Sequence, residues 1–379
     1  DRMIPAGLPC YCLAALMRLS HRQKSVVMAL IVLVVIMLML ALAEGAVQLR
    51  QYFKSGYSGN ISELLRDEDG LRVLIPDVDS RTISINSLGF RGPPISQEDA
   101  VGNLRIAFVG ASTTFCAEVS GNDMTWPHLV SADIRQQYPD IQTDYVNAAV
   151  PGYTVKTSLK NFRRRVAPLS PDITIIYHAT NDLSWETRKL AAEQGIYDAD
   201  EEGKGGWLAR HSSLLYLVLK NLSIKEAQDN AGGERELLEF SAAELGGNFR
   251  KYLTKLVREA QSVSEVVALV TFSQQIRPEQ TPEQQLAASV SSTYYMPFMK
   301  PAGLMDAYAR YNRIIAEVAG ETGALLIDGE MMIPGDSEHF NDTVHFKDAG
   351  SRVMARRVSQ ALMESPEFKY LAEEKRGTN

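Results

Sequence analysis

Five residues of this 379-residue chain have side chains or backbone groups that could together perform acyl transfer. Ser112 offers a hydroxyl, which is a weak nucleophile until a base takes its proton. His345 could be that base, and Asp342, three residues earlier, could hold the imidazole in the right tautomer. The backbone N–H groups of Ser112 and Gly152 and the side-chain amide of Asn181 could stabilise the oxyanion that forms on the substrate. The sequence therefore predicts serine-dependent ester chemistry.

Each of these residues also has a plainer interpretation. The serine could cap a helix N-terminus, and the glycine and asparagine could be ordinary turn residues. A second D-x-x-H pattern, Asp336 to His339, competes with Asp342 to His345. We favour His345 because it directly precedes the last helical pattern, which begins at about residue 348.

Apolar runs with the length and composition of buried strands precede most of these residues. The runs are LRIAFVG (104–110), TDYVNAAV (143–150), DITIIYH (172–178), SEVVALVTF (264–272) and ALLID (324–328). Helical patterns separate them, and this alternation indicates a mainly parallel sheet with helices on both faces. Ligands bind beyond the carboxyl ends of such strands, so the predicted residues should meet at one edge. The predicted fold class is a three-layer α/β/α sandwich.

This domain is expected over residues 101–366, with insertions at about 185–245 and 274–300 and a C-terminal tail at 367–379. Long insertions of this kind are typical of lids or surface loops. The aromatic stretch TYYMPFM in the second insertion is interpreted as packing rather than substrate contact. We interpret His178 as a buried core histidine and Cys116 as a small buried apolar residue. Asp182 is interpreted as a helix cap or loop tie, and the run Arg163–Arg165 as a solvated helix face.

The ordered set of segments GAST, NAAVPGYT, HATND and NDTVHF resembles the SGNH (GDSL-type) hydrolase superfamily. The resemblance implies a flavodoxin-like sheet, a serine nucleophile at Ser112, and the roles given above to the other four residues. The first segment has G-A-S where the superfamily has G-D-S, and Ala179 replaces the usual glycine of the third segment. The preceding stretch INSLGFRG is similar to membrane-anchored bacterial members of that superfamily.

An uncharged run of 18 residues, Val26–Ala43, is long enough to cross a membrane as a helix, which we expect over residues 25–44. Arg18, Arg22 and Lys24 precede it, so the positive-inside rule places residues 1–24 in the cytoplasm. A stalk and edge element, 45–100, would then lead to the main domain on the far side. In a bacterium this is a single-pass inner-membrane protein with a periplasmic domain. A cleaved signal is the alternative, because Ala41-Leu42-Ala43 resembles a cleavage site.

The predicted function is a membrane-anchored, extracytoplasmic serine esterase that works through an acyl-serine. Two alternatives remain open: an O-acyltransferase that modifies a glycan outside the cytoplasm, and an inactive subunit of a membrane complex. The expected partners are an acyl ester or glycan, membrane lipid and an integral-membrane protein. A net charge of −7 gives no reason to expect nucleic acid. No metal or cofactor is predicted, because Cys10 and Cys12 have no further ligands nearby.

Overall fold

The structure is a computed structural model, and it describes residues 20–55, 61–95, 102–197 and 237–377, with a few residues between 212 and 225. The N-terminal residues with Cys10 and Cys12, and most of the Gly-rich part of the first predicted insertion, lie outside the described residues.

A five-stranded parallel sheet forms the centre of the molecule. Its strands are β5 (Leu104–Gly110), β6 (Thr143–Asn147), β7 (Ile173–Tyr177), β8 (Val266–Val270) and β9 (Leu325–Ile327), in the order β6-β5-β7-β8-β9. Every neighbouring pair is parallel. All residues of β5, β7 and β8 are buried, as expected for strands covered on both faces. The predicted fold class is confirmed.

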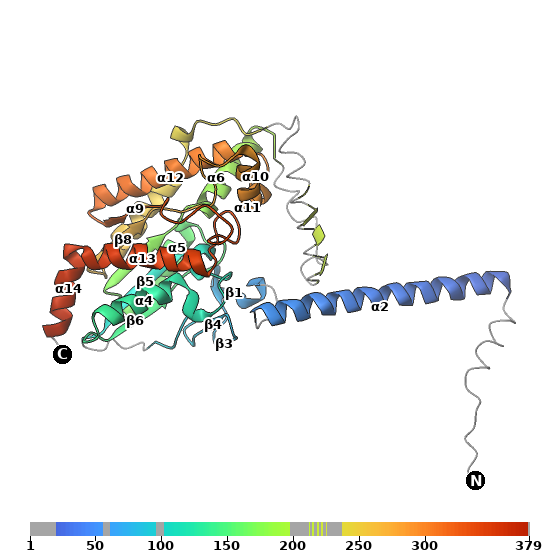
Figure 1. Ribbon diagram of the computed structural model, residues 1–379, viewed down its shortest axis with the longest axis horizontal. Helices are drawn as coiled ribbons and strands as arrows, with labels where there is room; N and C mark the ends of the chain where they lie inside the picture. The colour runs from blue at the N-terminus through green and yellow to red at the C-terminus, as the bar shows by residue number, and fades with distance from the viewer. Residues whose placement is uncertain are drawn as a thin grey trace, which may run out of the picture.

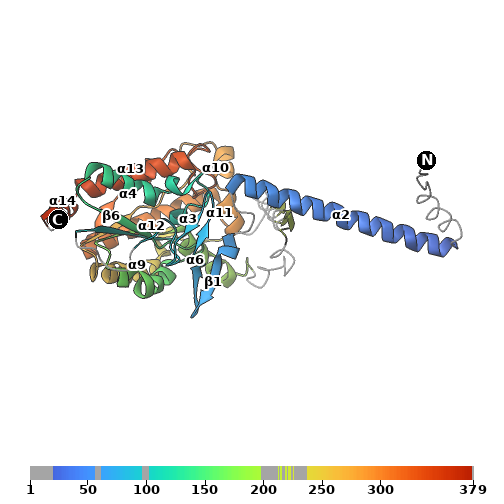
Figure 2. The ribbon, with the colours of Figure 1, turned by 90° about the horizontal axis from the view of Figure 1, so that it is seen from below.

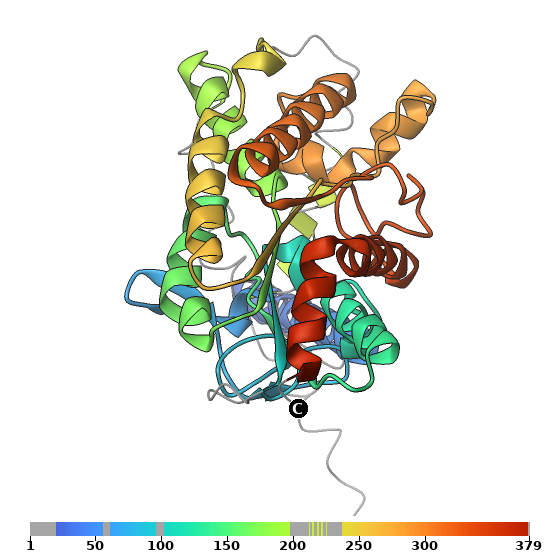
Figure 3. The same ribbon diagram turned by 90° about the vertical axis from the view of Figure 1, so that its left-hand side faces the viewer.

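Helices cover both faces of the sheet (Figures 1 and 3). On one face α4 (Trp126–Gln137) packs against α13 (Asp348–Glu364). On the other face α9 (Gly247–Gln261) packs against both α5 (Val155–Asn161) and α12 (Pro301–Thr322). The first strand of the sheet in chain order is β5, which lies inside the sheet. The next strand, β6, is added on one side of it, and β7, β8 and β9 are added on the other side. The strand order therefore reverses next to β5, and this reversal is where ligands bind in doubly wound folds.

Shorter elements complete the domain. The helices are α3 (Ser112–Phe115), α6 (Thr180–Glu193), α10 (Pro282–Ala288), α11 (Val290–Tyr295) and α14 (Pro366–Gly377). One π-helical turn, η3 (Phe162–Val166), extends α5. The 3₁₀ turns are η1 (Ile61–Leu64), η2 (Asn122–Met124), η4 (Ala167–Leu169) and η6 (Ala242–Glu244). Residues 366–377, where the sequence analysis expected a C-terminal tail from residue 367, form a helix whose Phe368, Leu371 and Ala372 are buried.

Two antiparallel hairpins precede the sheet and pack onto it. They are β1 (Leu65–Glu68) with β2 (Leu71–Leu74), and β3 (Val78–Asp79) with β4 (Ser84–Ile85). Their apolar side chains form a second, smaller core with Ala111 and Phe115 near α3 and with Ala149, Val150 and Tyr153 after β6. Residues 61–85, which we expected to be a stalk with an edge element, are therefore joined to the loops that carry Ser112 and Gly152.

The helix α2 (His21–Ser55) projects away from the domain as a single rod (Figures 1 and 2). Within its segment His21–Arg50, the most apolar window of 18 residues has a mean hydropathy of 3.3, and none of that window is buried in the protein. By length and composition this segment could cross a membrane or serve as a signal sequence. The helix continues to Ser55, past the predicted end at residue 44, because residues 45–55 contain no proline to end it.

Candidate active site

The turn from β5 into α3 fixes the position of Ser112. A Cβ atom on Gly110 would lie 2.0 Å from Thr114 Oγ1, so only glycine fits at the end of the strand. Ala111 is the N-cap of α3, and no side chain caps this helix. Ser112 is the first residue of the helix, so its hydroxyl is free of the capping role that we considered. The N-cap interpretation of Ser112 is wrong.

The structure brings Ser112, His345 and Asp342 into one hydrogen-bonded chain. Ser112 Oγ lies 2.8 Å from His345 Nε2, and His345 Nδ1 lies 2.9 Å from both carboxylate oxygens of Asp342. A carboxylate only accepts hydrogen bonds, so Nδ1 of His345 carries the proton that it donates to Asp342. Nε2 of the neutral ring is then the acceptor for the Ser112 hydroxyl. This is the arrangement that a serine nucleophile and its base require.

Asp342 is held as a charged acceptor. Its Oδ1 accepts hydrogen bonds from the backbone N–H groups of Val344 and His345, each at 3.0 Å. Burial acts to raise the pKa of Asp342, but the charge of His345 and these hydrogen bonds outweigh it and lower the pKa to about 2. Asp342 is therefore ionised at every pH at which the protein would be expected to work.

The competing pair has the same local structure in a different place. His339 Nδ1 lies 2.8 Å from Asp336 Oδ1, which also accepts from the backbone N–H groups of Glu338 and His339. The Asp336 side chain is 53% exposed against 26% for Asp342. Within the described part of the chain, it is His345 and not His339 that reaches Ser112. The two D-x-x-H patterns form the same turn, and only their positions distinguish them.

The second predicted insertion supports the loop of Asp342 and His345. The backbone N–H of Ser292 in α11 donates to Thr343 Oγ1 at 3.3 Å, and the N–H of Thr343 donates to Ser291 Oγ at 3.2 Å. Met296, Phe298 and Met299 of the aromatic stretch are buried, in agreement with a packing role. The sequence analysis did not connect residues 274–300 with the site, because nothing local in Ser291 and Ser292 indicates a partner 51 or 52 residues away.

The loop of Gly152 and the first turn of α6, which contains Asn181, are tied together by hydrogen bonds. Gly152 has a φ of +84°, a left-handed conformation that favours glycine. Asn181 Nδ2 donates to the carbonyl oxygen of Tyr153 at 2.9 Å. Asp182, the next residue, accepts from the N–H of Val155 at 3.0 Å, which agrees with its predicted role as a loop tie. One amide N–H of Asn181 is thus used to hold the Gly152 loop, which leaves its second N–H to point elsewhere.

Comparison with known proteins identifies the family. The model of the GDSL-like lipase/acylhydrolase family matches residues 108–353. The chain belongs to this family. The resemblance to SGNH (GDSL-type) hydrolases that the sequence predicted is therefore confirmed, and the protein is an ester hydrolase or acyltransferase. The comparison with curated protein sequences gives no match.

Solved structures similar to this GDSL-like hydrolase include three esterases or hydrolases. An acetylxylan esterase from Geobacillus stearothermophilus has 17% identity and a TM-score of 0.41, with 68% of this chain and 93% of that chain covered. A lipase/acylhydrolase from Enterococcus faecalis has 17% identity and a TM-score of 0.42, with 68% and 95% covered. An α/β hydrolase from the metagenome of Lake Arreo, Spain, has 16% identity and a TM-score of 0.41, with 68% and 94% covered.

A buried arginine stabilises the α3 turn of this GDSL-like hydrolase by hydrogen bonds to backbone carbonyl oxygens. Arg91 belongs to the stretch INSLGFRG, and its guanidinium donates to the carbonyl oxygens of Phe115, Cys116 and Thr82, the last two at 2.8 and 2.6 Å. It also lies 4.7 Å from the centre of the Phe115 ring. Carbonyls at the C-terminal end of a helix are otherwise without partners, so Arg91 satisfies those of α3. The sequence analysis used this stretch only for its resemblance to membrane-anchored bacterial members of the superfamily and gave Arg91 no role.

Two buried titratable groups and one half-buried one have shifted pKa values. Burial lowers the pKa of His178 to about 3, and its Nε2 lies 2.8 Å from Ser158 Oγ, in agreement with a core histidine. Burial raises the pKa of the Cys116 thiol to about 12, so this thiol is not a nucleophile. Burial also raises the pKa of Glu118, whose charge interacts with His345 and Asp342, and Glu118 Oε2 has no hydrogen-bond partner among the described residues. The sequence analysis missed Glu118.

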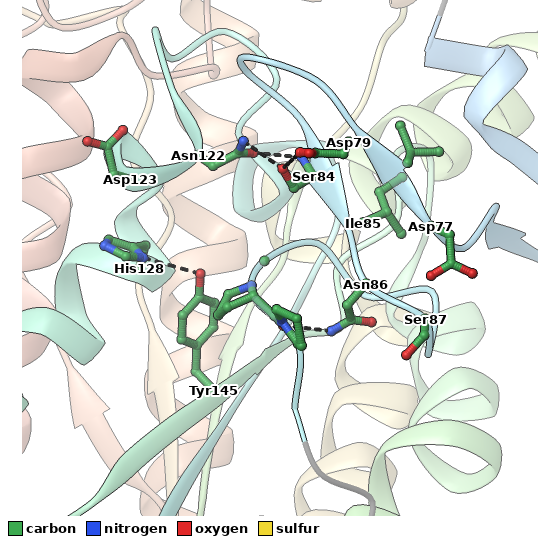
Figure 4. A pocket seen from close by; sticks show the side chains of 14 residues that line it. Asp77, Asp79, Ser84, Ile85, Asn86, Ser87, Asn122, Asp123, His128 and Tyr145 are labelled. Atoms are coloured by element: carbon green, nitrogen blue, oxygen red, sulfur yellow. Dashed lines mark hydrogen bonds between the residues drawn. The ribbon is translucent and has the colours of Figure 1, made fainter.

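A separate pocket of about 620 Å³ lies between the β3–β4 hairpin and the start of α4 (Figure 4). Asp77, Asp79, Asp123, His128 and Tyr145 are among the residues that line it. The predicted site residues do not line this pocket, so it is not where the Ser112 hydroxyl would meet an ester. In the part of the chain that the structure describes, no group of three or more His, Cys, Asp or Glu side chains could hold a metal ion.

Proposed function

We propose that the protein is a serine esterase in which Ser112 is the nucleophile, His345 the general base and Asp342 the residue that orients His345. The hydrogen bond of 2.8 Å between Ser112 Oγ and His345 Nε2 carries this proposal. It supports an active enzyme over an inactive subunit, because a chain that had lost turnover would have no need to keep this geometry.

The reaction then has two halves. In the first, Ser112 Oγ attacks the ester carbonyl carbon while its proton passes to His345 Nε2. The tetrahedral oxyanion accepts hydrogen bonds from the N–H groups of Ser112 and Gly152 and from the free amide N–H of Asn181. When the C–O bond to the alcohol breaks, His345 returns the proton to the leaving oxygen, and an acyl-serine remains. In the second half a water molecule loses its proton to His345 and attacks the acyl carbon, which frees the acid and restores Ser112.

Transfer to a sugar hydroxyl instead of water is the second candidate reaction, because the same acyl-serine serves both. We propose hydrolysis first, since it needs no acceptor beyond water. Incubation with 4-nitrophenyl acetate and an acceptor oligosaccharide, followed by mass spectrometry, distinguishes them. Free acetate supports the esterase, and a gain of one acetyl group on the oligosaccharide supports the acyltransferase.

We further propose that α2 anchors the enzyme in a membrane with the domain on the far side from the cytoplasm. The apolar, unburied span of α2 and the basic residues before it support this orientation. Membrane lipid is then its first partner, and an integral-membrane protein is the partner expected if an acyl donor has to be delivered across the membrane.

Labelling by a fluorophosphonate probe tests the assignment of residues. The wild type should be labelled, Ser112→Ala should not be labelled, and His345→Ala should be labelled at least about a hundredfold more slowly. His339→Ala is the matched control, because His339 has the same local pairing with an aspartate, and it should be labelled like the wild type. Normal labelling of Ser112→Ala, or loss of labelling only in His339→Ala, would refute the assignment.

A further inference from the structure

The guanidinium of Arg72 lies beside the proposed oxyanion donor Gly152. One of its terminal nitrogens is 2.7 Å from the place that a Cβ atom on Gly152 would occupy, and 3.4 Å from the carbonyl oxygen of Pro151. Arg72 is in β2 and is exposed. A positive charge therefore stands at the edge of the place where the ester carbonyl must bind.

The hairpin that carries Arg72 is fixed to the same loop. The Tyr153 hydroxyl donates to the carbonyl oxygen of Arg72, and Lys160 Nζ donates to the carbonyl oxygen of Gly70 at 2.7 Å. Leu71 and Val73, on either side of Arg72, are buried in the second core. The position of the Arg72 backbone relative to Gly152 is thus set by packing and hydrogen bonds, as a recognition residue requires.

Arg72 has no carboxylate partner within the described ranges. Asp67 stands opposite it in the hairpin register, but Asp67 Oδ1 accepts from the N–H of Gly70 at 3.0 Å. Glu68 pairs with Arg66 at 2.9 Å. A guanidinium presents its N–H donors in a planar fork that matches the two oxygens of a carboxylate. The charge of Arg72 therefore remains available for an anionic group of a ligand.

The chain segments on either side of Arg72 suit a polar ligand better than a lipid chain. Within the described residues from 61 to 184, no large apolar side chain is exposed. The next exposed one along the chain is Trp185, which is 56% exposed. Trp185 follows Asn181 by one helical turn on α6, so both residues lie on the same face of that helix. A flat exposed indole next to the site gives sugar rings a surface on which to stack.

From these observations we propose that Arg72 binds a carboxylate of the substrate, so that the enzyme acts on short acyl esters of an acidic glycan, with the uronate carboxylate close to the esterified hydroxyl. This inference rests on the proposed function, because it assigns the acceptor side of the same acyl transfer. Arg72 would then determine specificity, whereas Ser112 and His345 carry out the chemistry.

The test compares two acetylated oligosaccharides that differ in charge, oligogalacturonate and xylo-oligosaccharide. With the full-length wild type at low salt, kcat/KM should be about 10- to 100-fold higher for the acidic probe, the effect expected of one charge-assisted hydrogen bond. Arg72→Gln should reduce this ratio to about 1, mainly through KM, and Arg72→Lys should give an intermediate ratio because it loses the planar fork. Added salt should reduce the ratio for the wild type.

Arg163→Gln is the matched control, because it removes the same charge from an exposed arginine that is paired with Glu259. It should leave the ratio unchanged. The inference is overturned if Arg72→Gln keeps the wild-type ratio, or if it lowers the rates for both probes equally through kcat. Faster hydrolysis of phospholipid vesicles than of either oligosaccharide also overturns it.

A binding measurement keeps this test separate from the proposed function. Full-length Ser112→Ala in detergent micelles, which cannot turn over, should bind acetylated oligogalacturonate in calorimetry, and the double variant with Arg72→Gln should bind it at least about tenfold more weakly. Equal binding by both would refute the role of Arg72 even if the esterase is active. If the fluorophosphonate probe does not label Ser112 in the wild type, the proposed function is refuted, and the role of Arg72 in binding is still decided by calorimetry.

Discussion

At the residue scale, Asp342 and Asp336 are two aspartates in the same turn, each paired with a histidine three residues later. They differ in the partner of the histidine: Nε2 of His345 contacts Ser112 Oγ, whereas His339 makes no hydrogen bond to Ser112 among the described residues. Asp342→Asn should lower kcat by about 10⁴-fold, because an amide at this position can stabilise the wrong tautomer of His345. Asp336→Asn should change kcat by less than about twofold, which is the usual range for a surface change away from the chemistry. Release of 4-nitrophenol from 4-nitrophenyl acetate measures both, and a larger loss in Asp336→Asn would contradict the assignment.

His178 and Asp182, four residues apart, titrate in opposite directions on folding. Burial lowers the pKa of His178 from 6.5 to about 3, so the folded state binds fewer protons than the unfolded state between these values. This contribution makes stability rise with pH. Burial raises the pKa of Asp182 from 3.8 to about 7, so the folded state binds more protons across that window, and this contribution makes stability fall as pH rises.

Asp182→Asn should therefore remove the Asp182 contribution, which makes stability fall as pH rises, and leave the His178 contribution, which makes stability rise with pH. The free energy of unfolding of Asp182→Asn minus that of the wild type should increase with pH by up to about 1.4 kcal/mol per unit between roughly pH 4 and 7. Urea unfolding at pH 4, 5, 6 and 7 measures this difference. A difference that stays constant over these four values would show that the carboxyl of Asp182 keeps its ordinary pKa in the fold.

At the scale of elements, the two ends of β5 each have a fully buried arginine. Arg91 holds the α3 turn at the carboxyl end, and Arg105 pairs with Asp144 at 2.9 Å near the other end. Replacing either by lysine removes the planar fork and leaves buried acceptors unsatisfied, so both variants should have a lower melting temperature.

Only Arg91→Lys should also impair the chemistry. A shift of about 1 Å in the α3 turn misplaces Ser112 against His345, and such shifts cost about a hundredfold in rate. The rate of fluorophosphonate labelling, measured well below both melting temperatures, should fall in Arg91→Lys and stay near that of the wild type in Arg105→Lys. Equal rates in the two variants would mean that Arg91 contributes to stability alone.

The sequence predicted the sheet and the segments at its carboxyl end because buried parallel strands leave a strong local pattern. It favoured His345 over His339 because His345 shortly precedes a long helical pattern, which the structure shows as α13, and the 2.8 Å contact of His345 with Ser112 supports that choice. It missed the roles of Arg91 and of the hairpins at 65–85, because their partners are distant in the chain: Arg91 lies 24 residues before Phe115 and Tyr153 lies 81 residues after Arg72. In contrast, α14 has a local helical signal, because Leu371 and Ala372 follow Phe368 by three and four residues.

At the scale of the whole molecule, the proposed anchoring of α2 would place the domain beside a membrane. A helix of 35 residues is about 52 Å long, which exceeds the roughly 30 Å of the hydrocarbon core. If α2 is the proposed anchor, its last turns extend out of the membrane toward the domain. Glu44, just after the apolar run, accepts hydrogen bonds from Ser212 Oγ at 2.7 Å and from the N–H of Leu214 at 3.0 Å. This contact joins residues of the first insertion to α2 at the end of its apolar run, so with α2 as the proposed anchor we expect the domain to stay close to the membrane surface.

We expect α2 to be retained in the mature protein as a membrane anchor. The alternative is that a signal peptidase cleaves the chain after Ala43. If α2 is an anchor, the full-length protein should stay with the membranes after carbonate extraction, with N-terminal and C-terminal tags on one band. The double variant Ala41→Leu, Ala43→Leu is the control, because it removes the small residues that a signal peptidase requires and leaves the helix apolar. It should behave like the wild type. A wild-type protein that is shorter and soluble, together with a variant that remains on the membrane, would show that residues 1–43 are a signal and that the domain is released.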